Sequence, residues 1–140
     1  MHFDCEYRVC YGDTDRMGVV YYGKYYTIFE RGRTEMLRSA GLPYSELERL
    51  GCFLPVVESF CKYRSSAKYD DLLTLRSVVL ESSRVRMKIG TQVLRDGELL
   101  ASGYVVLGCV DSNGKISRLH PELIEACKRF QLPEGEEWTV

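Results

Sequence analysis

The chain has 140 residues, of which 45% are apolar, and 19 Lys and Arg residues nearly balance 20 Asp and Glu residues for a formal charge of −1. This length suits one compact domain that buries roughly two-thirds of its unfolded surface. The absence of a dominant basic field excludes broad nucleic-acid binding, although a local cluster of Lys and Arg can hold a phosphorylated small molecule.

The first ten residues, MHFDCEYRVC, are charged and lack the apolar stretch of a signal peptide. No segment reaches the length of a membrane span, so we expect a cytoplasmic protein. The six cysteines are even in number but show no CxxC spacing. Because cytosolic thiols are normally kept reduced, this pattern favours free thiols over a disulfide or zinc framework.

The first predicted strand covers Phe3 to Tyr11, where apolar residues alternate with polar ones. After Gly18 the spacing becomes helical, and we expect a long helix from Gly18 to Arg38 that ends near Ala40, with Gly41 in a C-terminal cap position. One face of this helix carries an apolar stripe: Tyr22, Tyr25, Tyr26, Phe29 and Met36. The charged residues are expected to form its polar face and its interface salt links: Glu30, Arg31, Arg33, Glu35 and Arg38.

A short second helix is predicted from Tyr44 to Leu50, closed by Gly51. The signals from Cys52 onward are those of strands and turns. The apolar stretch from Phe53 to Val57 contains Pro55, which indicates an edge strand or a bulge.

Three strands with regular alternation follow, and we expect them over Leu73 to Val79, Val85 to Val93 and Ala101 to Cys109. Asp96-Gly97 favours the positive φ values of a tight hairpin turn between the last two. Asn113-Gly114 offers another such turn.

A short helix from Pro121 to Phe130 and an acidic tail from Pro133 to Val140 complete the chain. One strand, one long helix and about four antiparallel strands cannot make a parallel α/β sheet, because the crossovers are missing. The sequence therefore predicts a single α+β domain over residues 1–132, with the helix buried on the concave side of the sheet and a loose tail over residues 133–140.

The segment YGDTDRMGVVYYGKYY places Asp13, Asp15 and Gly18 just ahead of the predicted helix. A carboxylate there lies beside unpaired N–H groups and the positive end of the helix dipole, so this stretch can supply both a base and an electrophilic clamp. Taken alone, Asp at such positions is more typical of a cap or turn. A calcium loop is excluded, because Met17 and Lys24 occupy two of its ligand positions.

This element order, with the segments GDTDRMGVVYYGKYY, FERGRTEMLR, GLPYSEL and SAKYDDLLTL, resembles the hotdog-fold acyl-CoA thioesterases of the 4-hydroxybenzoyl-CoA thioesterase branch. The resemblance covers about Phe3 to Val110. Its most specific part is the aspartate three residues before Gly-Val-Val-Tyr, and the Tyr69-Asp70-Asp71 turn is a second marker. It implies an antiparallel sheet of about five strands wrapped around one long helix, no cofactor, and subunits paired into a homodimer or a homotetramer.

The resemblance also implies hydrolysis of an acyl-CoA substrate to the free acid and coenzyme A. Asp15 corresponds to the catalytic carboxylate, either as a general base for water or as a nucleophile that forms a mixed anhydride. The backbone N–H of Tyr22 corresponds to the group that polarises the thioester carbonyl. Gly18 and Tyr25 are expected beside them in the substrate site, whereas Asp13 is expected to serve the turn.

The histidine-bearing members of the acyl-CoA branch read Gly-Val-Val-Tyr-His-x-Asn-Tyr, but here Tyr22 replaces the histidine and Lys24 the asparagine. A histidine-assisted mechanism at that position is therefore absent. Two alternatives stay open: a non-catalytic module that binds acyl thioesters, and a hotdog hydratase, which needs a histidine that no residue near Asp15 supplies. Glu30 is a further helix-borne carboxylate, but it lies two turns beyond the N-terminal amides.

Arg84, Arg86 and Lys88 alternate with apolar residues, so we expect three cations on one face of a strand. They form either a solvated sheet face, which protects a strand from edge pairing, or contacts to the phosphates of coenzyme A. No metal site is predicted, since His2 and His120 lack paired ligand spacing, and His120 is expected to precede or cap the last helix.

Overall fold

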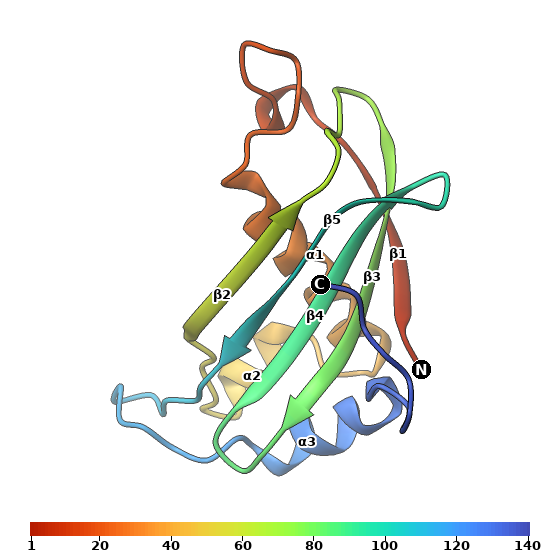
Figure 1. The fold of residues 1–140 in the computed structure, drawn as a ribbon. Coiled ribbons are helices and arrows are strands. Elements are labelled where there is room, and N and C mark those ends of the chain that lie inside the picture. The colour runs from red at the N-terminus through yellow and green to blue at the C-terminus, as the bar shows by residue number, and fades with distance from the viewer.

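One antiparallel sheet with the strand order β1-β3-β4-β5-β2 organises the computed structural model, which describes residues 1–140 (Figure 1). Its strands are β1 (Phe3–Arg8), β2 (Val56–Tyr63), β3 (Leu72–Ser82), β4 (Met87–Arg95) and β5 (Glu98–Leu107). The helices are α1 (Lys24–Ser39), α2 (Tyr44–Arg49) and α3 (Pro121–Cys127), with 3-10 turns at Tyr11–Asp13 and Lys128–Phe130. The predicted α+β class and the five-stranded antiparallel sheet are confirmed.

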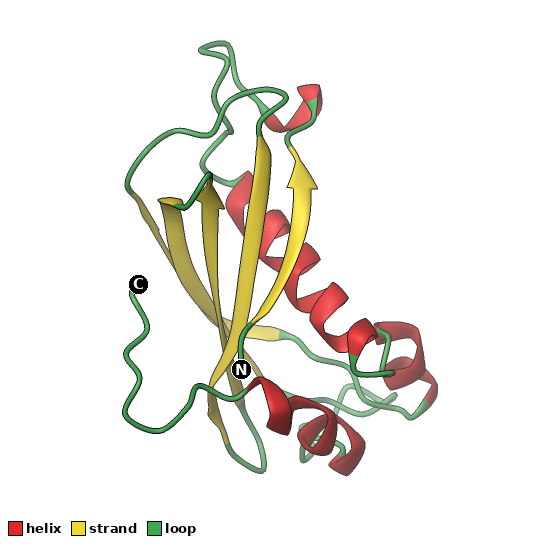
Figure 2. Ribbon diagram, turned by 90° about the vertical axis from the view of Figure 1, so that its right-hand side faces the viewer, coloured by secondary structure: helices red, strands yellow, loops and turns green.

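Helix α1 lies across one face of the sheet, which we call the inner face (Figure 2). It buries one side against the strands: Tyr25, Ile28, Phe29, Gly32, Met36 and Leu37. Helix and sheet approach closely at Gly32, where an added Cβ would lie 2.8 Å from the Ser77 hydroxyl oxygen. The predicted helix on the concave side of the sheet is confirmed, and it ends at Ser39 as expected near Ala40.

The start of α1 differs from the prediction, because the helix begins at Lys24 and not after Gly18. Residues 14–20 instead form a hairpin-like turn in which Thr14 pairs with Val20. Gly18 has a φ of 77°, a left-handed conformation that favours glycine. Tyr22 therefore precedes the helix, and it is 64% exposed instead of joining the buried stripe.

Strand β2 corrects the expected strand over Phe53 to Val57, because it starts at Val56 and continues to Tyr63. Phe53 makes only an isolated bridge to Val110. Every side chain of β2 except Cys61 is exposed, since β2 is an edge strand with one free side. Such a strand lacks the apolar alternation by which strands are recognised in a sequence.

The turns and caps mostly follow the sequence. Asp96 and Gly97 both have positive φ, of 50° and 81°, as predicted for the β4–β5 turn. His120 caps α3, because its Nδ1 accepts a hydrogen bond from the Glu122 N–H at 3.2 Å. Strand β4, however, begins at Met87 and not at Val85, so the residues just before it belong to the β3–β4 turn.

The tail over residues 133–140 was expected to be loose, but it lies on the outer face of the sheet, opposite α1 (Figure 2). The Gln92 side-chain amide donates to the Thr139 carbonyl at 3.2 Å, and Arg64 donates to the Val140 carbonyl at 3.1 Å. The Trp138 indole sits against Gly90, where an added Cβ would lie 2.7 Å from Nε1. No helix of the structure has the length and apolar character needed to span a membrane.

Candidate active site

Asp15 is held in the turn that precedes α1 by its own backbone and side chain. Its N–H donates to the Val19 carbonyl at 3.0 Å, and its carbonyl accepts from the Gly18 N–H at 3.0 Å. Oδ1 accepts a third bond from the Met17 N–H at 2.8 Å. Oδ2 has no hydrogen-bond partner, and the side chain is exposed. The turn thus fixes the carboxylate while leaving one oxygen free for a ligand or water.

Asp13 has a different role, because its carboxylate binds other groups of the turn through Oδ2. Oδ2 accepts hydrogen bonds from the Cys10 N–H at 2.8 Å and from the Tyr7 hydroxyl. Burial, and then the hydrogen bond to Asp13, raise the pKa of Tyr7, so its hydroxyl stays a donor. The Asp13 carbonyl also accepts from the Tyr21 N–H at 2.8 Å. These bonds confirm Asp13 as the turn residue that the sequence indicates.

A pocket of about 310 Å³ opens beside Asp15, between the start of α1 and the end of β2. The structure brings Asp15, Tyr22 and Tyr25 together in its wall, with Gly18 in the adjoining turn. The remaining wall comes from Val19, Val20 and the segment Tyr63–Ser66. No group of three or more His, Cys, Asp or Glu side chains that could hold a metal ion occurs anywhere in the structure.

The backbone around Tyr22 presents unpaired donors to this pocket. The N–H groups of Tyr22 and Gly23 have no hydrogen-bond acceptor, whereas the neighbouring Lys24 N–H donates to the Tyr21 carbonyl at 2.9 Å. Both residues come just before α1, and Tyr22 lines the Asp15 pocket. The site therefore combines one free carboxylate oxygen with free N–H donors.

Tyr63 belongs to the site, although the sequence analysis did not identify it. Its hydroxyl donates to the Tyr22 carbonyl at 3.0 Å, and its ring packs edge-on against Tyr25 with centroids 5.3 Å apart. Tyr25 is only 3% exposed, and burial raises its pKa. Tyr63 thus fixes the backbone that carries the free N–H groups. The sequence could have indicated Tyr63 only by its place at the end of strand β2. That strand has no apolar alternation, so it was not recognised.

The loop between β2 and β3 forms the opposite wall and is held by an ion pair. Arg95 Nη1 lies 2.7 Å from Asp71 Oδ2, which also accepts from the Lys68 N–H at 2.8 Å. Burial acts to raise the pKa of Asp71, but the bonds from Lys68 and Arg95 outweigh it and lower the pKa. The Ala67 carbonyl accepts from the Val20 N–H at 2.8 Å, which joins this loop to the Asp15 turn.

The structure does not bring Arg84, Arg86 and Lys88 to Asp15 within one chain. Arg84 and Arg86 lie in the β3–β4 turn instead of on a strand, at the end of the sheet opposite the Asp15 turn (Figure 1). The expectation of three cations on one strand face is therefore wrong.

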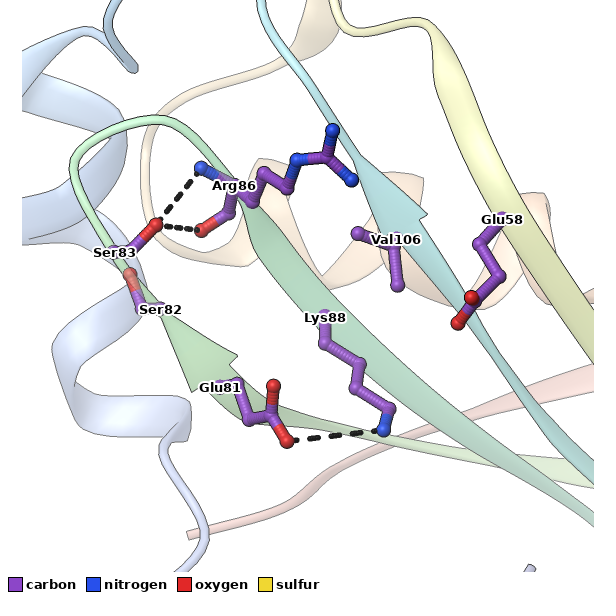
Figure 3. Close-up of a pocket in the computed structure, with 7 residues that line it drawn as sticks. All are labelled: Glu58, Glu81, Ser82, Ser83, Arg86, Lys88 and Val106. Carbon is purple, nitrogen blue, oxygen red and sulfur yellow. Dashed lines mark hydrogen bonds and ion pairs between the residues drawn. The ribbon is translucent and has the colours of Figure 1, made fainter.

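Figure 3 shows Arg86 and Lys88 in a shallow pocket on the outer face of the sheet, together with two carboxylates, Glu58 and Glu81. Lys88 Nζ lies 3.8 Å from a Glu81 oxygen and 4.2 Å from the centre of the Tyr104 ring. The positive charge of Lys88 is therefore already compensated in part, and this pocket is of mixed charge.

Comparison with known proteins agrees with this geometry. Residues 9–134 match the model of the thioesterase-like superfamily. A putative esterase of Aquifex aeolicus is 30% identical over 128 residues, which cover 91% of this chain and 99% of the relative. The acyl-CoA thioesterase YbgC of Haemophilus influenzae is 34% identical over 110 residues, covering 78% of this chain and 81% of the relative.

The solved structure of a DHNA-CoA thioesterase from Staphylococcus aureus superimposes with a TM-score of 0.85 at 29% identity, covering 91% of this chain and 89% of that one. The family match extends over most of the chain, and the five-stranded antiparallel sheet with its long helix is the fold that the resemblance implied. The chain therefore belongs to the thioesterase-like superfamily, as a thioester hydrolase of the hotdog fold.

Proposed function

We propose that the chain hydrolyses acyl-CoA thioesters to the free acid and coenzyme A, with the Asp15 carboxylate as the catalytic base or nucleophile. The observation that carries this proposal is the free Oδ2 of Asp15 in the same pocket wall as Tyr22, whose N–H has no acceptor. Relatives named as acyl-CoA thioesterases, which are 34% identical to this chain, support the choice of substrate class.

The chemistry follows from these two features. A thioester carbonyl placed against the free N–H of Tyr22 gains negative charge on its oxygen as it is attacked, and a fixed backbone donor stabilises that charge without reorganising. Asp15 takes a proton from the attacking water, or attacks the carbonyl carbon itself to give a mixed anhydride that water then opens. In both routes the C–S bond breaks, and the thiolate of coenzyme A leaves and is protonated.

The edge strand β2 supports a homodimer as the active unit. Its outer backbone groups are unpaired, and it exposes Val56, Val57, Phe60 and Tyr63 by 42–49%. An exposed apolar edge of this kind is a template for pairing with another chain. Antiparallel pairing of β2 with β2 of a second copy completes the sheet and covers these side chains. A dimer of such dimers, and a cytoplasmic location, remain predictions.

This pairing also gives Arg84, Arg86 and Lys88 a route to the substrate. The β3–β4 turn lies at the Val56 end of β2, since both Val56 and Met87 pair with Leu107. Antiparallel pairing brings the Val56 end of one copy to the Tyr63 end of the other, and hence to its Asp15 pocket. In the dimer, the three cations of one subunit are therefore proposed to contact the phosphates of coenzyme A bound at the other.

The experiment compares the parent with Asp15→Asn on a panel of acyl-CoAs, with free acid and coenzyme A separated by chromatography. Asn keeps the Oδ1 acceptor for the Met17 N–H but can neither take a proton nor attack. We expect kcat to fall by about 10²–10⁴-fold, the usual contribution of a general base, with unchanged melting temperature. Asp96→Asn is the matched control, because Asp96 is exposed in the β4–β5 turn and its φ of 50° suits Asn. Equal rates for parent and Asp15→Asn would refute the assignment of Asp15.

A further inference from the structure

Arg33 is the one arginine of α1 that points into the protein without a partner. Its Nη1 atom is buried and forms no hydrogen bond. Arg38 on the same helix pairs with Glu35 at 3.4 Å at the surface, and Arg31 lies over the Tyr7 ring. The salt link expected for Arg33 does not form within the chain, and the buried charge requires an explanation.

The Arg33 side chain lines a cavity of about 410 Å³ between α1, α2 and the start of β2. Most of the wall is apolar and includes Leu37, Leu54 and Val56. Tyr44 contributes a second polar group, whose hydroxyl oxygen accepts from the Leu54 N–H at 3.1 Å. The hydroxyl proton of Tyr44 has no acceptor, so two unpaired donors share one apolar cavity. A mostly apolar cavity with a few convergent polar groups is the usual form of a small-molecule site.

The charge balance indicates what fits this cavity. Burial lowers the pKa of Arg33, which reflects the cost of removing its charge from water. Glu30 also borders the cavity, and its charge acts to raise the pKa of Arg33 without outweighing burial. The Glu30 side chain is exposed and does not come within ion-pair distance of the guanidinium. A buried guanidinium nitrogen without a hydrogen-bonded anion is unfavourable, and a carboxylate with two oxygens is the partner that the planar donors of Arg33 match best. The cavity is thus prepared for an anionic oxygen ligand.

The Arg33 cavity and the Asp15 pocket lie at opposite ends of strand β2. The Arg33 cavity includes Val56 at one end of this strand, and the Asp15 pocket includes Tyr63 at the other. When two copies pair antiparallel about the centre of β2, the strands lie about 4.8 Å apart and Val56 of one copy lies beside Tyr63 of the other. The Arg33 cavity of one subunit then adjoins the Asp15 pocket of its partner.

We propose that Arg33 and Tyr44 are specificity residues that bind a carboxylate at the far end of the acyl group, so that the preferred substrates are ω-carboxyacyl-CoA thioesters. This inference rests on the proposed acyl-CoA hydrolysis and on pairing through β2. The thioester lies at the Asp15 pocket of one subunit, and the acyl chain extends into the adjoining cavity. Arg33 and the Tyr44 hydroxyl there donate to the two carboxylate oxygens.

The test compares matched substrates that differ only in the terminal carboxylate: succinyl-, adipoyl- and suberoyl-CoA against butyryl-, hexanoyl- and octanoyl-CoA. For the chain length that spans the two pockets, we expect the parent to prefer the carboxylate by at least about tenfold in kcat/KM. Arg33→Met should remove that preference, a loss of about tenfold to a hundredfold, which is the range for a hydrogen bond to a charged group. The loss should fall on KM more than on kcat, since the contact is equally strong in ground state and transition state.

Two further variants separate recognition from folding. Arg38→Met is the matched control on the exposed side of α1 and should keep the preference. Tyr44→Phe should lose part of it. Arg33→Met should melt at the same temperature as the parent or higher, because methionine fills an apolar cavity without a buried charge. If Arg33→Met does not fold, the substrate preference of the parent and of Tyr44→Phe decides the question.

The outcomes are distinct. A parent that hydrolyses the alkanoyl-CoAs as well as their carboxylated counterparts overturns the carboxylate site while leaving the proposed hydrolysis intact. A preference that survives in Arg33→Met overturns the role of Arg33. A protein that hydrolyses no acyl-CoA removes the proposed function, and this inference with it.

Discussion

Replacing Asp71 by Asn tests whether the ion pair behind the Asp15 pocket holds the wall of the site. Asp71 accepts from Arg95 at 2.7 Å and from the Lys68 N–H at 2.8 Å. The side chains of the pair are only 27% and 23% exposed. Both bonds go to Oδ2, so an Asn whose side-chain oxygen takes that place keeps both acceptor contacts and loses only the negative charge that Arg95 faces.

A hydrogen bond to a charged group contributes about 1.5–3 kcal/mol. Partial exposure of the pair and the retained bond to Lys68 reduce the expected cost to about 1–2 kcal/mol. For a chain of 140 residues, this corresponds to a fall in melting temperature of about 3–7 °C. Asp70→Asn is the matched control, since Asp70 is exposed, approaches only Arg8 at 4.0 Å and has a positive φ that Asn tolerates.

The pH dependence identifies the cause. The pKa of Asp71 is lowered in the folded state, so its contribution to stability is complete above the unfolded pKa of about 3.9 and is lost as the pH falls through the folded value. Melting temperatures of parent and Asp71→Asn, measured by circular dichroism, should therefore differ at pH 6 and converge as the pH falls through the lowered pKa of Asp71. A difference of the same size at both ends of this range would refute the electrostatic reasoning.

Two further substitutions test the packing of α1 and of the tail. Gly32→Ala adds a Cβ that meets the Ser77 oxygen at 2.8 Å. We therefore expect the free energy of unfolding, measured by chemical denaturation, to fall by about 1–3 kcal/mol despite the better helix propensity of Ala. A more stable variant would contradict this close approach. Gly90→Ala forces away the Trp138 indole on the outer face. Because Trp138 is the only tryptophan, its fluorescence should shift to the red while acyl-CoA hydrolysis is retained, and an unchanged spectrum would show that the tail does not lie there.

The sequence predicted the strands, caps and turns that depend on residues close together in the chain. Alternation identified β1, β3, β4 and β5, and Gly41, Gly51 and Gly97 have the positive φ that caps and turns require. The segment around Asp15 was likewise recognisable, because a carboxylate, a glycine and a following helix lie within ten residues of one another. Asp13 was separable from Asp15 only through the family resemblance, which gives Asp15 a role and Asp13 none. The bonds of Asp13 to Cys10 and Tyr7 agree with a role in the turn.

Contacts between distant segments could not be read in this way. Tyr63 reaches Tyr22 across 41 positions, on a strand whose exposed side chains hide its periodicity. Arg33 has the same sequence signal as any helical cation, and only the packing of α2 and β2 around it decides that its Nη1 is buried. The tail was predicted to be loose from its acidic sequence. Its contacts with Gln92 and Gly90 join segments far apart in the chain, so the tail sequence alone does not reveal them.

The sequence by itself determined the order of elements, the α+β class, the family and the carboxylate at the start of the site, since these depend on periodicity and on short motifs. The tertiary structure decided which end of the sheet each charge occupies. Strand order sets that placement, and it put Arg84 and Arg86 far from Asp15 while enclosing Arg33 in a cavity. Burial depends on neighbours brought together by the whole chain, and no local pattern records it.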